Sequence, residues 1–291
     1  MRRCATLATV MELGVQKPGN VSPAHPKYPC FLDGAVAIAD PLGRLASDYP
    51  AYSVGSAIGD CVQAMLSAAG ENTHLGTILL FAPLTAASKS RSRSLRGALS
   101  GVLSSASVDD AVQTCEAIQK VRPAGLTDVA DTALDVRNPE APREIRGRGL
   151  TLVEWMTIEV EDNAISGEYG SDYQLVFEMG LPHLLRGLRG GKGWSASILQ
   201  TFLILLSNRL DTLILGTHGR GIAQQVSLQA RDLLGENGVM NASAVSDFDR
   251  QLTAKNINPG TTADLVVTTV FAALLSSSKG GNAAALRSFT R

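Results

Sequence analysis

Apolar residues recur along much of the chain at the three- and four-residue spacing of an amphipathic helix. From Val108 to Ile118 they fall at positions i, i+3, i+4, i+7 and i+10, which places them on one helical face. Ser107-Val108-Asp109-Asp110 opens this segment with a hydroxyl that suits an N-cap, and Pro123 lies beyond its end. The segment therefore has a start, an apolar stripe and a stop, and we expect a helix there.

Further helices follow from the same signals. Thr151-Leu152-Val153-Glu154 and Ser171-Asp172-Tyr173-Gln174 both have the form of a capping box, in which a hydroxyl and an acid or amide satisfy unpaired N–H groups. A stripe of apolar residues from about 219 to 234 is followed by Gly235, a typical C-cap residue. The last helix is expected from about Thr262 into Leu275.

Three stretches interrupt this pattern and are expected to be loops. Residues 17–29 contain four prolines, residues 88–107 are rich in Ser, Arg and Gly, and residues 122–149 hold several Pro, Gly and Asp residues. Alternating β-branched segments joined by a tight hairpin turn do not occur. We therefore predict an all-α protein, a single large multi-helix domain over residues 1–291, with polar loops at helix starts forming a nucleotide site.

Composition and charge narrow the possible partners. Hydrophobic residues make up 45% of the 291 residues but aromatic residues only 5%, which favours closely packed helices of Ala, Leu and Val. The formal net charge of -1 creates no long-range attraction for nucleic acid or an anionic membrane, so a polyanion must be held locally. The cysteines at positions 4, 30, 61 and 115 have neither metal-type nor disulfide-framework spacing. Reduced thiols in a cytoplasmic protein are the expectation.

Membrane insertion and targeting are not expected. The most apolar stretch, Ile198 to Leu206, is far shorter than the roughly 20 residues that a membrane span needs, and it reads as a buried core helix. The basic start of the chain is followed by an apolar segment that Thr6 and Thr9 interrupt and Glu12 ends, which is unlike a signal peptide.

The first candidate segment follows the helix that contains Glu12, which should end near Gly14. Lys17 offers an ammonium group, Gly19 allows close approach of the backbone, and Asn20 offers both a donor and an acceptor. This combination suits phosphate oxygens. An ordinary Pro-Gly turn explains the same residues, and the local sequence alone favours that turn because such four-residue motifs are common.

The second candidate segment, Glu71-Asn72-Thr73-His74-Leu75-Gly76-Thr77, precedes an apolar run. Asn72 or Thr73 could cap the helix that begins there, and a helix start is an anion site because its N–H groups are unpaired. Glu71 could instead ligate a metal. A plain N-cap beside a solvated Glu and His fits equally well.

The third candidate segment, Asn258-Pro259-Gly260-Thr261-Thr262-Ala263-Asp264, is a turn that leads into the last helix. Asp264 lies three residues after Thr261, in the first helical turn, where its carboxylate could cap the helix or hold Mg²⁺. Asp211 stands in an otherwise apolar context, so its carboxylate needs a partner or a cation.

Taken in order along the chain, these segments resemble the triphosphoribosyl-dephospho-CoA synthase family over nearly the whole length. The resemblance implies an all-α fold and the transfer of a triphosphoribosyl unit from ATP to dephospho-CoA, with release of adenine. ATP is then a substrate, Mg²⁺ an expected cofactor, and dephospho-CoA the expected acceptor. The residues that carry the resemblance are Glu12, Lys17 to Val21, Asn72 to Gly76, Asp211 and Thr212, and Asn258 to Leu265.

In this chemistry a ribose hydroxyl attacks C1′ of the ATP ribose, so the site must bind triphosphate, stabilise an oxocarbenium-like centre and remove a proton. The resemblance assigns these tasks to three groups. The catalytic candidates are Glu12, Glu71 and Asp211; the substrate- or phosphate-binding candidates are Lys17, Gly19, Asn20, Asn72, Thr73, Gly76, Asn258, Gly260 and Thr261; and the metal candidates are Glu71, Asp211 and Asp264.

Three departures from the family pattern point to a divergent branch, found in archaea and in bacteria that make methanopterin-type cofactors. Leu75 replaces a lysine, Leu213 replaces an asparagine, and Thr261 and Thr262 replace Gly and Ser. An ATP- or phosphoribosyl-dependent enzyme acting on another acceptor is therefore an alternative, as is a non-catalytic nucleotide-binding helical protein. The sequence leaves a homodimer open.

Overall fold

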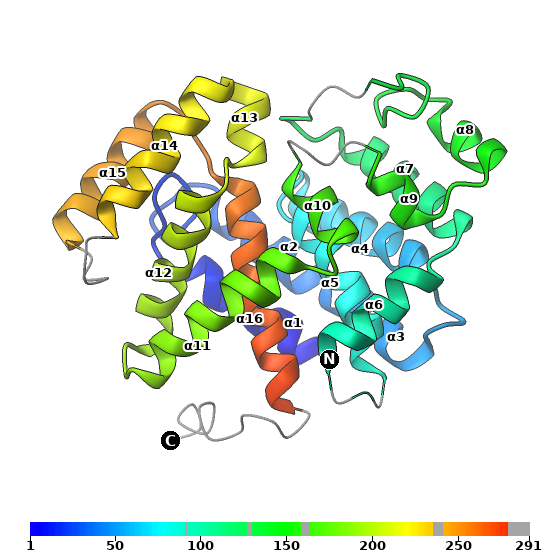
Figure 1. The fold of residues 1–291 in the computed structure, drawn as a ribbon, viewed down its shortest axis with the longest axis horizontal. Coiled ribbons are helices and arrows are strands. Elements are labelled where there is room, and N and C mark those ends of the chain that lie inside the picture. The colour runs from blue at the N-terminus through cyan, green and yellow to red at the C-terminus, as the bar shows by residue number, and fades with distance from the viewer. Residues whose placement is uncertain (91, 93, 127–129, 159–162, 235–240, 279–291) are drawn as a thin grey trace. The chain divides into compact units, whose positions relative to one another are not determined.

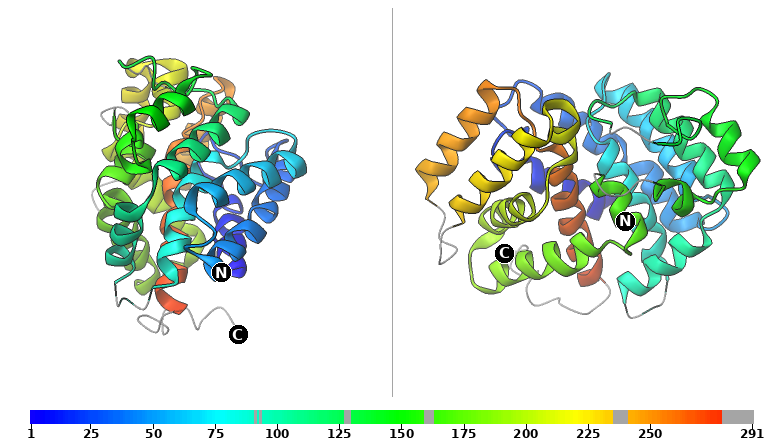
Figure 2. Two further views of the ribbon diagram at one scale, coloured as in Figure 1. Left: turned by 90° about the vertical axis from the view of Figure 1, so that its right-hand side faces the viewer. Right: turned by 45° about the horizontal axis from the view of Figure 1, so that its top comes forward.

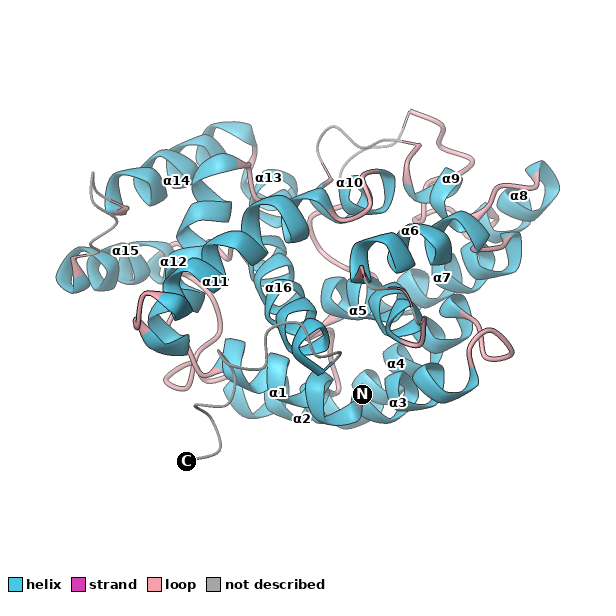
Figure 3. Cartoon of the chain, turned by 60° about the horizontal axis from the view of Figure 1, so that its bottom comes forward, coloured by secondary structure: helices cyan, strands magenta, loops and turns pink. Residues whose placement is uncertain are grey.

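A computed structural model describes residues 1–90, 92, 94–126, 130–158, 163–234 and 241–278 (Figure 1). Regular structure in these ranges is helical, and the described residues form no strand, which confirms the all-α fold class (Figure 3). The chain divides into two compact units. The first unit comprises Met1–Thr6 and Pro29–Tyr173, and the second comprises Leu7–Tyr28 and Gln174–Arg291. The single domain over residues 1–291 stays a prediction.

The first unit is organised around α5, which is apolar on all sides. Every residue from 77 to 87 of this helix is buried, and α3, α4, α6 and α10 pack against it. A helix without a polar face has to be enclosed by others, so α5 forms the centre of this core. The helices of this unit are α2 (Tyr28–Ala37), α3 (Ala39–Asp48), α4 (Val54–Ala69), α5 (Leu75–Ser88), α6 (Leu95–Ser105), α7 (Val108–Val121), α8 (Ala141–Arg148), α9 (Leu152–Met156) and α10 (Ala164–Gly170).

The second unit is organised around α16 in the same way. Elements η1, α11, α12 and α13 pack against α16, the red helix of Figure 2. A Cβ on Gly180 would lie 2.3 Å from Thr269 Oγ1, so glycine permits the close approach of η1. After α1 (Arg2–Leu13), whose first residues belong to the first unit, the elements are η1 (Leu175–Gly180), α11 (Leu181–Arg189), α12 (Gly193–Asn208), α13 (Thr212–His218), α14 (Arg220–Leu233), α15 (Ala242–Ala254) and α16 (Gly260–Ser278).

Among the described residues of this unit, two stretches have the length and apolar character of a membrane span. They are Gly260–Ser277 and the pair α12 and α13, which are bent by 54°. Within Gly260–Ser277, however, 72% of the stretch is buried inside the protein, as in the core helix of a soluble protein. The expected core helix at 198–206 is confirmed, because Ile198, Phe202 and Leu206 of α12 have no exposed surface.

Most of the predicted helix starts are confirmed. Ser107 and Asp110 form both arms of a capping box at α7, and Thr151 and Glu154 form both arms at α9. The helix containing Glu12 ends at Leu13. Helix α14 ends at Leu233, while the expected cap Gly235 lies outside the described residues.

Two of the expected loops contain helices, so those expectations were wrong. Helix α6 lies within 88–107, and Ser94 caps it by accepting the N–H of Gly97. Its buried residues Leu95, Ala98, Leu99, Val102 and Leu103 follow helical spacing, a pattern that the surrounding Ser and Arg residues obscured. Helix α8 lies within 122–149 and ends at Arg148, and its C-cap Gly149 has a left-handed φ of 68°.

The expected capping box at Ser171 to Gln174 was also wrong. Asp172 and Tyr173 have left-handed φ values of 51° and 58°, and the next element is the π-helix η1. Tertiary contacts explain this backbone. The buried Tyr173 hydroxyl donates to Leu80 O at 3.1 Å, and the Arg96 guanidinium donates to Ser171 O and Asp172 O. These bonds outweigh the local preference for a cap.

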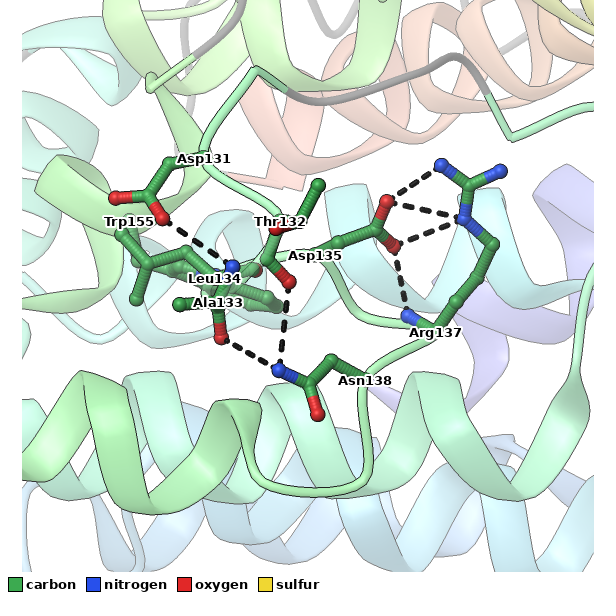
Figure 4. A network of polar contacts seen from close by, with 8 residues as sticks. All are labelled: Asp131, Thr132, Ala133, Leu134, Asp135, Arg137, Asn138 and Trp155. Carbon is green, nitrogen blue, oxygen red and sulfur yellow. Dashed lines mark hydrogen bonds and ion pairs between the residues drawn. The ribbon is translucent and has the colours of Figure 1, made fainter.

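Residues 130–140, which precede α8, form an irregular segment that its own polar contacts hold (Figure 4). Asp135 accepts bonds from the backbone N–H and the guanidinium of Arg137, which hold the pKa of that carboxyl below its usual range although burial opposes them. Asn138 Nδ2 donates to Thr132 O and Ala133 O. Side chains thus replace the backbone ladder that a helix would supply.

Candidate functional site

A buried ion pair joins the end of α1 to the loop that follows it. Lys17 has no exposed surface, and its Nζ lies 2.9 Å from Glu12 Oε1. The same ammonium donates to Glu12 O at 2.9 Å and to Val15 O at 3.0 Å. Two carbonyl oxygens and the carboxylate of Glu12 thus surround the ammonium. Lys17 therefore closes the turn that follows α1.

Electrostatics explains why these two charges are buried together. Burial raises the pKa of the Glu12 carboxyl, and the positive charge of Lys17 opposes this shift. Neither charge alone would tolerate complete desolvation, whereas the pair is neutral as a unit. A direct bond from Lys17 to a phosphate would require the ammonium to leave its present acceptors.

Gly19 brings this loop against the segment that precedes α16. Its φ is +71°, in the left-handed region, and a Cβ there would lie 2.4 Å from Ile257 O. Its N–H donates to Asp249 Oδ1 at 2.8 Å. Only glycine fits this backbone and this approach. The predicted role of Gly19 in binding phosphate stays a prediction.

The loop continues into a direct contact between two of the candidate segments. Asn20 Nδ2 donates to Asn258 Oδ1 at 2.9 Å, although 238 residues separate them. Both side chains are half-buried. The first and third candidate segments therefore meet within the second unit.

Asp211 joins the starts of two helices. Its Oδ2 accepts from the N–H of Thr262 at 2.7 Å and from its hydroxyl at 2.8 Å, while Oδ1 accepts from Ile214 N at 3.1 Å. Burial raises the pKa of this carboxyl, and the hydrogen bonds oppose that shift. The sequence predicted a partner or a cation for this carboxylate. Its partners are the first turns of α13 and α16.

These contacts gather polar groups at the beginning of α16, which we call the helix-start cluster: Asn20, Asn258, Gly260, Thr261 and Asp264. The first amides of a helix have no partner within its ladder, and the 19-residue α16 adds the partial positive charge of its N-terminus. Asn20, Asn258, Gly260 and Asp264 are partly exposed, while Thr261 is 9% exposed. The cluster offers neutral donors to an anion and one carboxylate to a cation.

The second candidate segment lies in the first unit, at the start of α5. Asn72 Oδ1 accepts the N–H of Leu75 at 3.1 Å, which confirms the expected cap. Thr73 Oγ1 is buried and has no hydrogen-bond partner among the described residues; a Cβ on Gly34 would lie 2.2 Å from it. Gly76, the second residue of α5, is partly exposed.

His74 and Glu71 differ sharply in their surroundings. Burial lowers the pKa of His74 to about 4, and its Nε2 lies 2.8 Å from Phe31 O. The imidazole is therefore neutral at pH 7 and supports the packing of α2. Glu71 is half-buried, and its Oε1 lies 3.4 Å from the thiol of Cys30.

The predicted metal residues are distributed between the units. Glu71 belongs to the first, and Asp211 and Asp264 belong to the second. Among the described residues, His, Cys, Asp and Glu side chains form no group of three or more that is arranged for a metal ion. The assignment of Mg²⁺ to these residues stays a prediction.

Two contributors to this arrangement escaped the sequence-based selection. Thr262 stands within the third segment but had no assigned role, and Asp249 lies inside α15 without any motif around it. An Asp in an amphipathic helix gives no local signal that a loop more than 200 residues away will bind it.

Comparison with known proteins adds two findings. Residues 1–283 match the sequence model of a family described as ATP:dephospho-CoA triphosphoribosyl transferase. The fold is similar to the crystal structure of a proposed triphosphoribosyl-dephospho-CoA synthase from Archaeoglobus fulgidus, with a TM-score of 0.68 and 23% sequence identity. That similarity covers 84% of this chain and 98% of the other, and it concerns the fold.

Proposed function

The chain belongs to the ATP:dephospho-CoA triphosphoribosyl transferase family, and on this premise we propose that the helix-start cluster binds the triphosphate of ATP. The chain is a transferase that uses ATP as the donor of a triphosphoribosyl unit, with dephospho-CoA as the acceptor of the family. One observation carries the proposal: Asn20 and Asn258 contact each other beside the first residues of α16.

The reaction sets clear demands on such a site. The bond between C1′ of the ATP ribose and adenine breaks, a bond between C1′ and an acceptor hydroxyl forms, and the hydroxyl proton moves to a base as adenine leaves with a proton. Throughout, the triphosphate stays attached to the ribose. The protein must therefore hold several negative charges firmly without hydrolysing them.

The helix-start cluster meets this demand with donors. The amides of Gly260 and Thr261 lie at the positive end of α16, and the side chain of Asn20 adds a further donor group. Asp211 fixes the first turn of the helix through Thr262. Lys17 stays a predicted phosphate ligand. Its contacts with Glu12 and Val15 support a second role, in which it stabilises the loop that carries Asn20.

Asp264 is the residue of this cluster that suits a magnesium ion. Mg²⁺ is bound by one or two carboxylates together with substrate phosphates. Asp211 is only 2% exposed, whereas Asp264 is half-buried on α16. When bound, Mg²⁺ would neutralise charge on the triphosphate, and Asp264 would supply its protein ligand.

Glu71 stays a predicted catalytic residue, and it lies within the first unit. Its carboxylate is half-buried, while Glu12 and Asp211 are buried. Asn72, Thr73 and Gly76 stay predicted substrate-binding residues at the start of α5. We expect the protein to act in the cytoplasm, where ATP is supplied.

A second candidate keeps the ATP site but changes the acceptor. It rests on Leu75, which is 7% exposed, and on Leu213, whose Cδ2 would lie 2.8 Å from a Cβ on Gly260. Both side chains therefore contribute packing at positions where the resembled family has a polar residue. A different acceptor would be consistent with this change.

The decisive assay follows free adenine by chromatography after incubation with ATP, Mg²⁺ and dephospho-CoA. We expect adenine and triphosphoribosyl-dephospho-CoA in equal amounts, neither product without dephospho-CoA, and at least a tenfold loss of rate in Asn20→Ala. Adenine release with another nucleoside acceptor in place of dephospho-CoA would favour the second candidate. ATP binding without adenine release from any acceptor would contradict both candidates.

A further inference from the structure

Asp249 of α15 binds the loop that leads to Asn20. Its Oδ1 accepts the N–H of Gly19 at 2.8 Å, and its Oδ2 accepts the side-chain amide of Gln16 at 2.8 Å. One carboxylate therefore receives two donors from a single turn. Hydrogen bonds to an ionised acceptor are stronger than those between neutral groups, so this contact is a firm support for the loop.

We infer that Asp249 is a positioning residue for the helix-start cluster, an inference that rests on the proposed binding of triphosphate there. Gly19 immediately precedes Asn20, and its left-handed φ of +71° sets the direction in which the chain continues. Asn20 N donates to Lys17 O at 3.0 Å, which closes the turn on the other side. Fixing the Gly19 amide thus fixes where the Asn20 side chain meets Asn258.

Helix α15 also contacts both of the segments that meet at Asn20 and Asn258. Val245, Phe248 and Leu252 bury one face of the helix. A Cβ on Gly19 would lie 2.8 Å from Leu252 Cβ, and Ile257 N donates to Leu252 O at 2.9 Å just before the Asn258 turn. The end of α15 therefore determines the spacing between the loop and the start of α16.

Asp249 is half-buried and lies on the loop-facing side of α15, whereas Asp247 on the same helix pairs with the exposed Arg250. This gives a matched control: the two carboxylates stand two residues apart, and only Asp249 contacts the loop in the described structure. Removing Asp249 should leave the fold intact but misplace a substrate contact. Such a loss raises KM for ATP more than it lowers kcat.

The test compares Asp249→Ala, Asp249→Asn and Asp247→Ala in the full chain. We expect Asp249→Ala to raise KM for ATP about tenfold, Asp249→Asn to stay within about threefold because an acceptor oxygen remains, and Asp247→Ala to match the unsubstituted protein. Hydrogen exchange of the peptide spanning residues 15–21 should quicken only in Asp249→Ala. If that variant fails to fold, Asp249→Ser replaces it.

Two outcomes would contradict the role of Asp249. An unchanged KM alongside faster exchange would show that the loop position does not govern ATP binding, and would overturn the inference. Unchanged exchange would show that Asp249 does not hold the loop, and would overturn it as well. If the unsubstituted protein releases no adenine, the proposed function fails instead, while the exchange measurement still decides whether Asp249 secures the loop.

Discussion

The role of Lys17 depends on its surroundings more than on its residue type. A lysine before Pro-Gly-Asn suggested a phosphate ligand, and that assignment stays a prediction. In the structure its ammonium lies among Glu12 Oε1, Glu12 O and Val15 O. The sequence contains no sign of this arrangement, because a lysine five residues after a glutamate can point towards it or into solvent.

We predict that Lys17→Met destabilises the protein by about 3–5 kcal/mol, because it leaves the buried carboxylate of Glu12 without its partner. Denaturant unfolding measures this loss. The double substitution Glu12→Gln with Lys17→Met should recover a large part of it, since the unpaired charge is then gone. The exposed Lys255 provides the control, and an equal effect of Lys255→Met would refute the prediction.

His74 gives a prediction about pH. Its folded pKa of about 4 lies below the ordinary value of 6.5, so the unfolded chain takes up the proton first as the pH falls. The stability that the neutral imidazole provides is full above pH about 6.5 and declines towards pH about 4, by about 3 kcal/mol.

Unfolding free energies measured between pH 7 and pH 4 check this expectation. Replacing His74 by Gln, which can still donate to Phe31 O, should flatten the decline. Identical pH profiles in His74→Gln and the unsubstituted protein would show that His74 does not cause it.

At the scale of elements, one carboxylate in each unit secures the starts of two helices. Asp110 completes the capping box of α7 and also accepts Gly55 N, in the first turn of α4, at 2.7 Å. Asp211 does the same for α13 and α16. The spacing of Ser107 and Asp110 predicted the helix start at α7. The second helix that each carboxylate contacts could not be predicted, because that contact depends on packing between distant segments.

The pKa of Asp110 reflects this double role. Burial raises it, but the bonds from Gly55 N, Ser107 N and the Ser107 hydroxyl together hold it below its usual range. The ionised Asp110 carboxylate therefore stabilises the fold at pH values above its pKa in the unfolded chain. This stabilisation is lost as the pH falls through its pKa in the folded protein.

We predict that Asp110→Ala lowers the free energy of unfolding by about 2 kcal/mol or more, because buried N–H groups lose their acceptor. The neighbouring Asp109→Ala should cost less than about 1 kcal/mol, because its pair with Arg146 is exposed. Thermal unfolding of both variants tests the difference, and comparable losses would argue against the linking role of Asp110.

At the scale of the whole molecule, helical periodicity was sufficient to predict the all-α class, because amphipathic helices such as α7 carry their own apolar face. It failed where composition concealed the face, as in α6, and where tertiary bonds dictated the backbone, as at Asp172 and Tyr173. The meeting of Asn20 with Asn258 was anticipated only through the resemblance to a family. Asp249 could not be anticipated, because its role depends on how α15 lies against the loop.

The central claim is that the start of α16 holds the triphosphate. A crystal structure with 9-deazaadenosine triphosphate, whose carbon–carbon glycosidic bond does not break, tests it most directly. We expect phosphate oxygens within hydrogen-bond distance of the amides of Gly260 and Thr261 and of the Asn20 side chain. A triphosphate bound elsewhere, with the helix-start cluster making no contact to it, would contradict the claim.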